Sequence, residues 1–196
     1  MFKIDKEFLE PKREVSTNLD EMFMAIAYAA ASNSVDPSTQ VGSCYVSKDN
    51  KVLSVGRNGA PSGWDEDEFP WGTKKEYGIK NMKYTYVEHA EMNGLTNYVG
   101  SKREFEGGTI YVTLFPCTQC AKLIASLGVK RVIYDEAREN CDDYECACIL
   151  LDKAGIEYIR FSELTNNNVD GIDISFSVGE KEGIKIRKRG TIKNTI

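Results

Sequence analysis

TIYVTLFPCTQCAKLIASLGVKRVIYD, residues 109–135, holds the signals of a strand, a helix and a second strand in direct succession. TIYVTL (109–114) and RVIYD (131–135) are short runs rich in β-branched and aromatic residues, which is typical of strands. CAKLIASLG (120–128) lies between them and predicts a helix that ends at a glycine. This order predicts two parallel strands joined by a helix.

The residues that follow repeat the alternation. A second helix is expected over about 143–154, ending at Gly155, and EYIRF (157–161) predicts a third strand. Strands that alternate with helices in this way predict an α/β fold, with a largely parallel sheet covered by helices on both faces.

Upstream, the chain predicts a helix and a hairpin. Residues 19–31 follow Asn18, a good N-cap, and carry apolar residues at helical spacing. Runs 43–47 and 52–56 flank a short polar turn and predict paired strands. A helix is expected over about 88–99.

A long segment and both ends of the chain lack a sustained pattern. Residues 57–82 predict a long loop, and such loops in compact domains are commonly functional. We expect an extension at 1–18, one domain at 19–161 and a second extension at 162–196. Within the second extension, residues 174–178 predict a strand. The basic end of the chain is expected to be a solvated run of charges, and a contact with a phosphate or a partner is the alternative.

Composition narrows the classes of function. The 196 residues, 41% hydrophobic, are enough to bury one sizeable core, and a formal net charge of −5 disfavours long nucleic acid as a partner. No apolar run is long enough for a membrane span or a secretory signal, so a soluble, cytoplasmic protein is expected. Six unevenly spaced cysteines favour reduced thiols and metal ligation over a disulfide scaffold.

The single histidine of the chain lies in VEHAEMNG, residues 87–94. His89 is followed by Glu91 and, further on, by Cys117 and Cys120 at i and i+3 of a helix start, which puts both sulfurs on one side. Pro116 suits the start of that helix, whose N-terminus favours thiolates. Three ligands with one open position are typical of catalytic zinc, and Glu91 is left to act as a base.

Other interpretations of these residues exist. A lone histidine at a helix start is more often a surface residue, and an isolated pair of cysteines at this spacing is often a redox pair or half of a structural zinc site. The two motifs in order, with Pro116 before the first cysteine, favour the catalytic interpretation. Cys141, Cys146 and Cys148 are irregularly spaced and are expected to be free thiols.

His-x-Glu followed by Pro-Cys-x-x-Cys resembles the signature of zinc-dependent nucleobase deaminases. Beyond it, the chain is similar to the deoxycytidylate (dCMP) deaminases over about 19–161. The stretches that carry this resemblance are FMAIAYAAASNSVDPSTQVGSCYV (23–46), VGRNGAPSGWDED (55–67), FPWG (69–72), KYTYVEHAEMN (83–93), GTIYVTLFPCTQCAKLIASLGVKRVIY (108–134) and LLDKAGIEY (150–158).

The resemblance implies a three-layer α/β/α cytidine-deaminase-like fold with a mixed five-stranded sheet. It implies zinc-dependent hydrolysis of dCMP to dUMP and ammonia, which supplies dUMP for dTMP synthesis. A homohexamer, activation by dCTP and inhibition by dTTP are common in the family. Glu91 is then the catalytic base, and His89, Cys117 and Cys120 are the zinc ligands.

The same resemblance implies that Asn58 contacts the sugar and that the start of the strand at Val41 lines the base pocket. The substrate-binding residues so expected are Asn58, Val41, Gly42, Ser43, Ala90, Phe115 and Pro116. Arg57 and Ser43 depart from the aromatic residue and the alanine usual in the family. Arg57 is a candidate contact for a substrate or effector phosphate, beside Lys74, Lys75, Lys83 and the basic tail, and Phe115, Tyr84 and Tyr86 are candidates to frame the base.

Two other classes remain as alternatives. A deaminase of single-stranded nucleic acid, or of another cytosine nucleotide, has the same zinc site. A nucleic-acid strand, however, needs a positively charged groove, which the net negative charge of the chain disfavours. A structural zinc protein needs a fourth ligand and has no use for Glu91.

Overall fold

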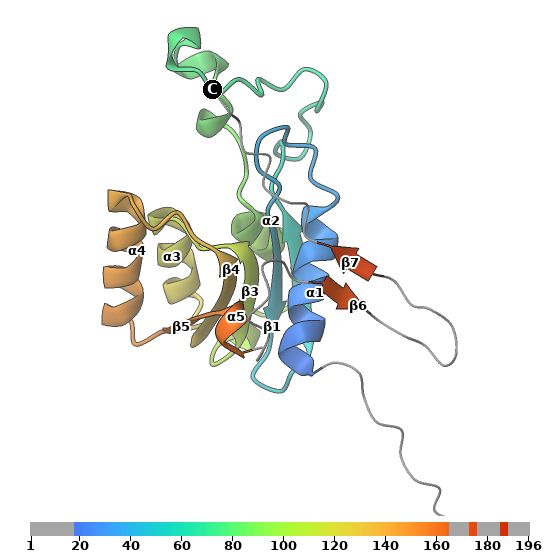
Figure 1. Cartoon of the computed structure of the whole chain (residues 1–196), viewed down its shortest axis with the longest axis vertical. Coiled ribbons are helices and arrows are strands. Elements are labelled where there is room, and N and C mark those ends of the chain that lie inside the picture. The colour runs from blue at the N-terminus through green and yellow to red at the C-terminus, as the bar shows by residue number, and fades with distance from the viewer. Residues whose placement is uncertain (1–17, 165–172, 176–184, 188–196) are drawn as a thin grey trace, which may run out of the picture.

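The computed structural model describes residues 18–164 and two short strands, 173–175 and 185–187. A five-stranded sheet lies at its centre with helices on both faces (Figure 1). Its strands are β1 (Gly42–Val46), β2 (Val52–Arg57), β3 (Thr109–Leu114), β4 (Arg131–Glu136) and β5 (Glu157–Arg160). The helices are α1 (Leu19–Ala31), α2 (Ala90–Thr96), α3 (Thr118–Ser126), α4 (Asp142–Lys153) and α5 (Phe161–Leu164).

The sheet is mixed, with strand order β2-β1-β3-β4-β5. β3, β4 and β5 are parallel, as the alternation of strands and helices predicts. β1 is antiparallel to β2, because a tight turn at Ser47–Asn50 returns the chain directly into β2, and it is also antiparallel to β3. The mixed five-stranded sheet implied by the family resemblance is therefore confirmed, and the largely parallel sheet expected from the alternation alone holds for one half.

Most predicted elements are present, with ends shifted by one or two residues. The largest difference is α2, expected over 88–99 and found over Ala90–Thr96. Gly59 and Glu88 exchange two backbone hydrogen bonds in an isolated bridge, so the chain stays extended up to His89, the N-cap. This bridge fastens the loop after β2 to the segment that carries the histidine.

Side chains of the central strands alternate between two cores. Val112 of β3 and Val132 of β4 pack with α2, α3 and α4 on one face. Tyr111 and Ile133, their neighbours in sequence, pack with α1 and α5 on the other. The alternation follows the two-residue period of a strand and produces the three layers, with α3 and α4 on one side and α1 on the other in Figure 1.

The helix that carries His89 and Glu91 lies unusually close to the hairpin. A Cβ atom on Gly56 of β2 would lie 2.1 Å from the carbonyl oxygen of Ala90 and 2.3 Å from the backbone nitrogen of Gly94. Ser43 Oγ donates a hydrogen bond of 2.8 Å to the Ala90 oxygen from β1. Glycine at position 56 thus lets α2 approach the sheet, and this contact fixes the first turn of the helix.

Outside these elements, the expected long loop at 57–82 is largely irregular. It contains the short 3₁₀ helices η2 (Lys75–Tyr77) and η3 (Ile79–Asn81), and η4 (Lys83–Thr85) follows it; η5 (Lys102–Phe105) precedes β3. β6 (Asp173–Ser175) and β7 (Lys185–Arg187) pair antiparallel. Part of the strand expected at 174–178 thus exists. Its remaining residues, most of the basic end and most of the N-terminal extension lie outside the described residues.

Among the described residues, no helix has the length and apolar character that a membrane crossing requires.

Candidate metal centre and active site

His89, Cys117 and Cys120 come together as one group of metal-ligating side chains. His89 is the N-cap of α2 and Cys117 is the N-cap of α3, so two helix N-termini meet here. The Nδ1 atom of His89 lies 3.4 Å from the sulfur of Cys117 and 3.4 Å from that of Cys120.

This geometry fits zinc. A tetrahedral ion with typical Zn–N and Zn–S bonds separates a nitrogen from a sulfur ligand by about 3.5 Å. The three donor atoms lie within 4.8 Å of one another, and no fourth histidine, cysteine or carboxylate joins the group within the described part of the chain. Three protein ligands and one open position are the pattern of a catalytic rather than a structural site.

Hydrogen bonds within this group set the charges of its sulfur and nitrogen atoms. The hydrogen bond from Cys120 lowers the pKa of Cys117 to about 4, so its sulfur is a thiolate at neutral pH. The hydrogen bond with Cys117 raises the pKa of His89 to about 9 against the opposing effect of burial. One thiolate is thus available at neutral pH, as a soft metal ion requires.

Glu91 lies beside the group and is buried, with a residue exposure of 4%. Burial raises the pKa of its carboxyl group above the ordinary range. The phenol of Tyr45, on β1, donates a hydrogen bond of 3.0 Å to the backbone oxygen of Glu91 and so holds this turn of α2 against the sheet. A buried carboxylate with a raised pKa is suited to take up and release a proton near neutral pH.

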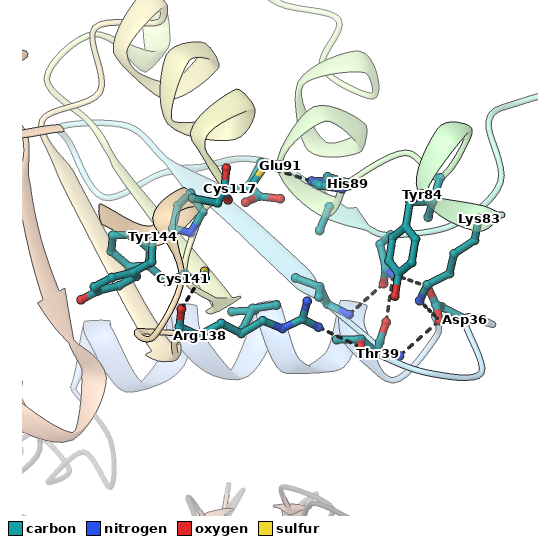
Figure 2. A pocket seen from close by; sticks show the side chains of 18 residues that line it. Asp36, Thr39, Lys83, Tyr84, His89, Glu91, Cys117, Arg138, Cys141 and Tyr144 are labelled. Carbon is teal, nitrogen blue, oxygen red and sulfur yellow. Dashed lines mark hydrogen bonds and ion pairs between the residues drawn. The ribbon is translucent and has the colours of Figure 1, made fainter. Parts of the chain in front are cut away.

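A cavity of about 290 Å³ adjoins Glu91 and the metal-ligating group (Figure 2). This volume is close to the lower end of the range for small-molecule sites, about 300–1,000 Å³. Asn58, Val41, Ala90, Phe115 and Pro116, all expected to contact substrate, are among its lining residues. The structure thus gathers five predicted residues from four separate segments around one cavity.

Three other predicted residues lie outside that lining. Gly42 faces α1, where a Cβ would lie 1.9 Å from the oxygen of Ala27, and Ser43 holds the start of α2. Arg57 donates to Glu66 at 3.2 Å. It is next to Asn58 in sequence, and neighbours in an extended chain point to opposite sides.

A buried network forms one wall of the cavity and was not predicted. Lys83 Nζ lies 2.7 Å from each carboxylate oxygen of Asp36, and Asp36 accepts further hydrogen bonds from the backbone nitrogens of Ser38 and Thr39. The Nδ2 atom of Asn58 donates to Asp36 and to the Thr39 oxygen. Asn58 Oδ1 accepts from Val41 N at 2.8 Å. The network fixes the 36–41 loop and holds the amide of Asn58 in one orientation.

Tyr84, a candidate to frame the base, also lines the cavity. The remaining lining residues were not predicted and come from several segments: Thr39, Val87, Leu114, Arg138, Cys141, Asp143 and Tyr144. Four of them follow the carboxyl end of β4, and ligands of α/β proteins bind at the carboxyl ends of strands. That rule, applied to residues 137–144, is the sequence signal that points to them. Of the aromatic residues expected at the base, Phe115 packs against Tyr134 and Tyr144, whereas Tyr86 contacts Trp64 outside the cavity.

A three-layer fold with a mixed sheet, a His/Cys/Cys group at two helix N-termini and a buried glutamate defines a zinc-dependent deaminase domain.

Comparison with known proteins identifies the family. Residues 17–136 match the model of the cytidine and deoxycytidylate deaminase zinc-binding region. Human deoxycytidylate deaminase is 38% identical over 151 residues, which cover 76% of this chain and 83% of the relative. The deoxycytidylate deaminase of Enterobacteria phage T4 is 26% identical over 80% of this chain and 97% of its own length. This chain belongs to the cytidine and deoxycytidylate deaminase family.

Solved structures agree with this assignment. A dCMP deaminase from the cyanophage S-TIM5, solved in complex with dCMP and dUMP, superposes with a TM-score of 0.57. It is 27% identical and covers 73% of this chain and 96% of that one. The family is zinc-binding, and zinc is the cofactor that the His89, Cys117 and Cys120 side chains fit.

Proposed function

We propose that this protein hydrolyses dCMP to dUMP and ammonia, with Glu91 as the catalytic acid–base and His89, Cys117 and Cys120 as zinc ligands. The observation that carries the proposal is the buried Glu91 carboxylate, which lies beside the three metal-ligating atoms at the edge of a nucleotide-sized cavity. The relatives named deoxycytidylate deaminase support dCMP as the substrate.

Zinc, when bound, lowers the pKa of a water ligand toward neutrality and so supplies a nucleophile at neutral pH. Glu91 accepts the two protons of the attacking water one after the other, and it donates the first to the ring nitrogen and the second to the departing ammonia. The raised pKa of its buried carboxyl suits both directions of transfer.

The cavity walls hold the rest of the nucleotide. Asn58 is part of the lining, and the 36–41 loop holds its amide in one orientation beside the sugar. Val41, Ala90 and Pro116 enclose the base. Gly42 and Ser43 do not line the cavity and act on the substrate indirectly. Gly42 sets the position of the start of β1, and Ser43 sets the position of α2.

Further properties rest on the family resemblance. They are one deaminase domain at 19–161 with extensions at both ends, a cytoplasmic homohexamer, a role in pyrimidine nucleotide biosynthesis, and activation by dCTP with inhibition by dTTP. Arg57, paired with Glu66 outside the cavity, is a candidate for the effector contact.

Two alternatives make different predictions. A deaminase of single-stranded nucleic acid requires a cationic groove for the strand, whereas this chain carries a formal net charge of −5. A structural zinc protein requires a fourth ligand, and the described residues place three donors in the group.

The test is ammonia release from dCMP, dCTP, deoxycytidine, CMP and a short cytosine-containing single strand, with and without added dCTP. Preferential turnover of dCMP supports the proposal, and turnover of the strand alone contradicts it. The matched control is Glu91→Gln, which keeps the shape of the side chain and removes its acid–base chemistry.

A further inference from the structure

A nucleoside monophosphate carries a phosphate that the metal centre does not bind, so a cationic side chain is needed elsewhere in the cavity. Two lysine or arginine residues are among the residues that line it, Lys83 and Arg138. Their surroundings differ sharply, and the difference decides which one is available to a phosphate.

The charge of Lys83 is already neutralised. Its Nζ lies 2.7 Å from both oxygens of Asp36, and the two side chains are 5% and 1% exposed. A phosphate brought to Lys83 would face the Asp36 carboxylate as well, and like charges at that distance repel. Lys83 therefore shapes the wall of the cavity.

The other candidates from the sequence lie elsewhere. Arg57 pairs with Glu66, and the exposed Lys74 lies 3.9 Å from Glu76. Neither they nor the exposed Lys75 belong to the cavity lining.

Arg138 is placed differently. It follows the carboxyl end of β4 and is exposed, and its Nη2 donates a hydrogen bond of 3.2 Å to the hydroxyl of Thr39. Figure 2 shows its side chain reaching from the Cys141 side of the cavity toward Thr39, on the opposite side from Glu91 and His89. This is the end of the cavity where the phosphate lies if the base is at the metal centre.

The acidic neighbours of Arg138 are engaged with other groups. Asp143 accepts from the backbone nitrogen of Thr118, and Glu139 pairs with Arg160. Within the described part of the chain, Arg138 forms no ion pair with a carboxylate. Its remaining guanidinium N–H groups, and the hydroxyl hydrogen of Thr39, are thus free to donate to an anion.

We propose that Arg138, with the Thr39 hydroxyl beside it, binds the 5′-phosphate and makes the site selective for nucleoside monophosphates over nucleosides. The inference rests on the proposed function and names its phosphate-recognising residue. Thr39 is suited to this role because its backbone is held in place: its backbone nitrogen donates to Asp36, and its carbonyl oxygen accepts from Asn58. The side chain that carries the hydroxyl therefore starts from a fixed position.

The experiment compares wild type, Arg138→Gln and Arg138→Lys with dCMP and with deoxycytidine. We expect Arg138→Gln to raise the KM for dCMP about 10- to 100-fold, the effect of losing a hydrogen bond between charged groups. We expect kcat/KM for deoxycytidine and the zinc content to stay unchanged, and Arg138→Lys to recover part of the loss. An equal fall for both substrates, or an unchanged KM for dCMP, overturns the proposal.

Binding of products tests the same inference without turnover. Calorimetry should show that wild type binds dUMP more tightly than deoxyuridine and that Arg138→Gln abolishes the difference, whereas the control Arg103→Gln, on the exposed η5 helix, keeps it. If wild type deaminates no cytosine nucleotide but keeps this Arg138-dependent preference, the proposed function fails and the phosphate site stands. If wild type binds dUMP and deoxyuridine equally, or if Arg57→Gln and not Arg138→Gln removes the preference, the phosphate site is wrong.

Discussion

The ammonium group of Lys83 lies 2.7 Å from both carboxylate oxygens of Asp36, in a pair almost completely closed to solvent. The two residues come from segments on opposite sides of the hairpin in sequence, before β1 and after the long loop. Their pairing ties that loop to the wall of the cavity opposite the metal-ligating group.

Lys83→Met is expected to destabilise the fold strongly, because it leaves the Asp36 carboxylate buried without its cation. Removing one partner of a buried ion pair costs about 3–5 kcal/mol. Lys74→Met is the matched control, since its pair with Glu76 is exposed and such pairs contribute about 0–1 kcal/mol. Urea unfolding measures both variants, and equal midpoints for the two would contradict a structural role for the buried pair.

Glu91→Gln is expected to keep zinc and lose turnover, because the amide retains the size of the side chain but cannot accept the proton. The loss of general acid–base catalysis corresponds to a fall of about 10²–10⁴-fold in kcat. His89→Ala removes one of the three ligands and is expected to lose zinc as well as activity. Metal analysis alongside ammonia release separates the two variants. Normal turnover by Glu91→Gln would exclude Glu91 from the chemistry.

Gly56→Ala is expected to displace α2, since the new methyl group would lie 2.1 Å from the Ala90 oxygen and 2.3 Å from the Gly94 nitrogen. Overpacking against side chains costs about 1–3 kcal/mol, and here the obstacles are backbone atoms that cannot rotate away. Zinc affinity should fall together with stability, because α2 begins at His89. Gly155→Ala is the control: its Cβ meets no atom within 4 Å, so only the strain of its positive φ remains. A Gly56→Ala protein with wild-type zinc affinity would show that α2 tolerates the shift.

Tyr28→Phe tests how α1 is held on the sheet. The Tyr28 hydroxyl donates to the Asp135 carboxylate at the end of β4. Burial raises the pKa of this phenol above its ordinary value, so the hydroxyl keeps its proton at neutral pH. A hydrogen bond to a charged group contributes about 1.5–3 kcal/mol. We expect a fall of that size in the free energy of unfolding, whereas the same substitution at the exposed Tyr77 should have little effect. Equal stabilities of the two variants would show that the Tyr28 bond contributes nothing.

The elements of this fold were predictable because their signals are local. The strands at 109–114 and 131–135 alternate between two cores, and the His89, Cys117 and Cys120 ligands follow from the spacing of two short motifs. The start of α2 was not predictable, because it depends on the bridge between Gly59 and Glu88, two residues far apart in sequence.

The far wall of the cavity could not be predicted for the same reason. Asp36, Lys83 and Arg138 come from three segments, and each taken alone is typical of a polar loop. Arg57 was a candidate phosphate contact because it replaces the aromatic residue usual in the family, but the alternation of an extended chain directs it to Glu66 instead. A single sequence does not indicate which charged residues, far apart along the chain, pair with each other in the folded protein.

Asn58→Asp keeps the shape of the side chain, removes its two hydrogen-bond donors and adds a negative charge. Asn58 Nδ2 lies 3.1 Å from Asp36 Oδ2 and 2.9 Å from the Thr39 oxygen, and a carboxylate cannot donate to either. The variant places a second negative charge against Asp36, so we expect lower stability and a higher KM for dCMP at neutral pH.

The loss in this variant should depend on pH. Repulsion from Asp36 raises the pKa of the introduced carboxyl in the folded state above the value of about 3.9 for an unfolded chain. The penalty is therefore greatest above the folded pKa and is relieved as the pH falls through it toward about 4. Urea unfolding between pH 7 and pH 4.5 should show the difference from wild type narrowing, whereas Asn33→Asp, at an exposed position, should show none. A difference that stays constant over this range would mean that Asp36 and position 58 do not interact electrostatically, and that the loss arises from the missing donor alone.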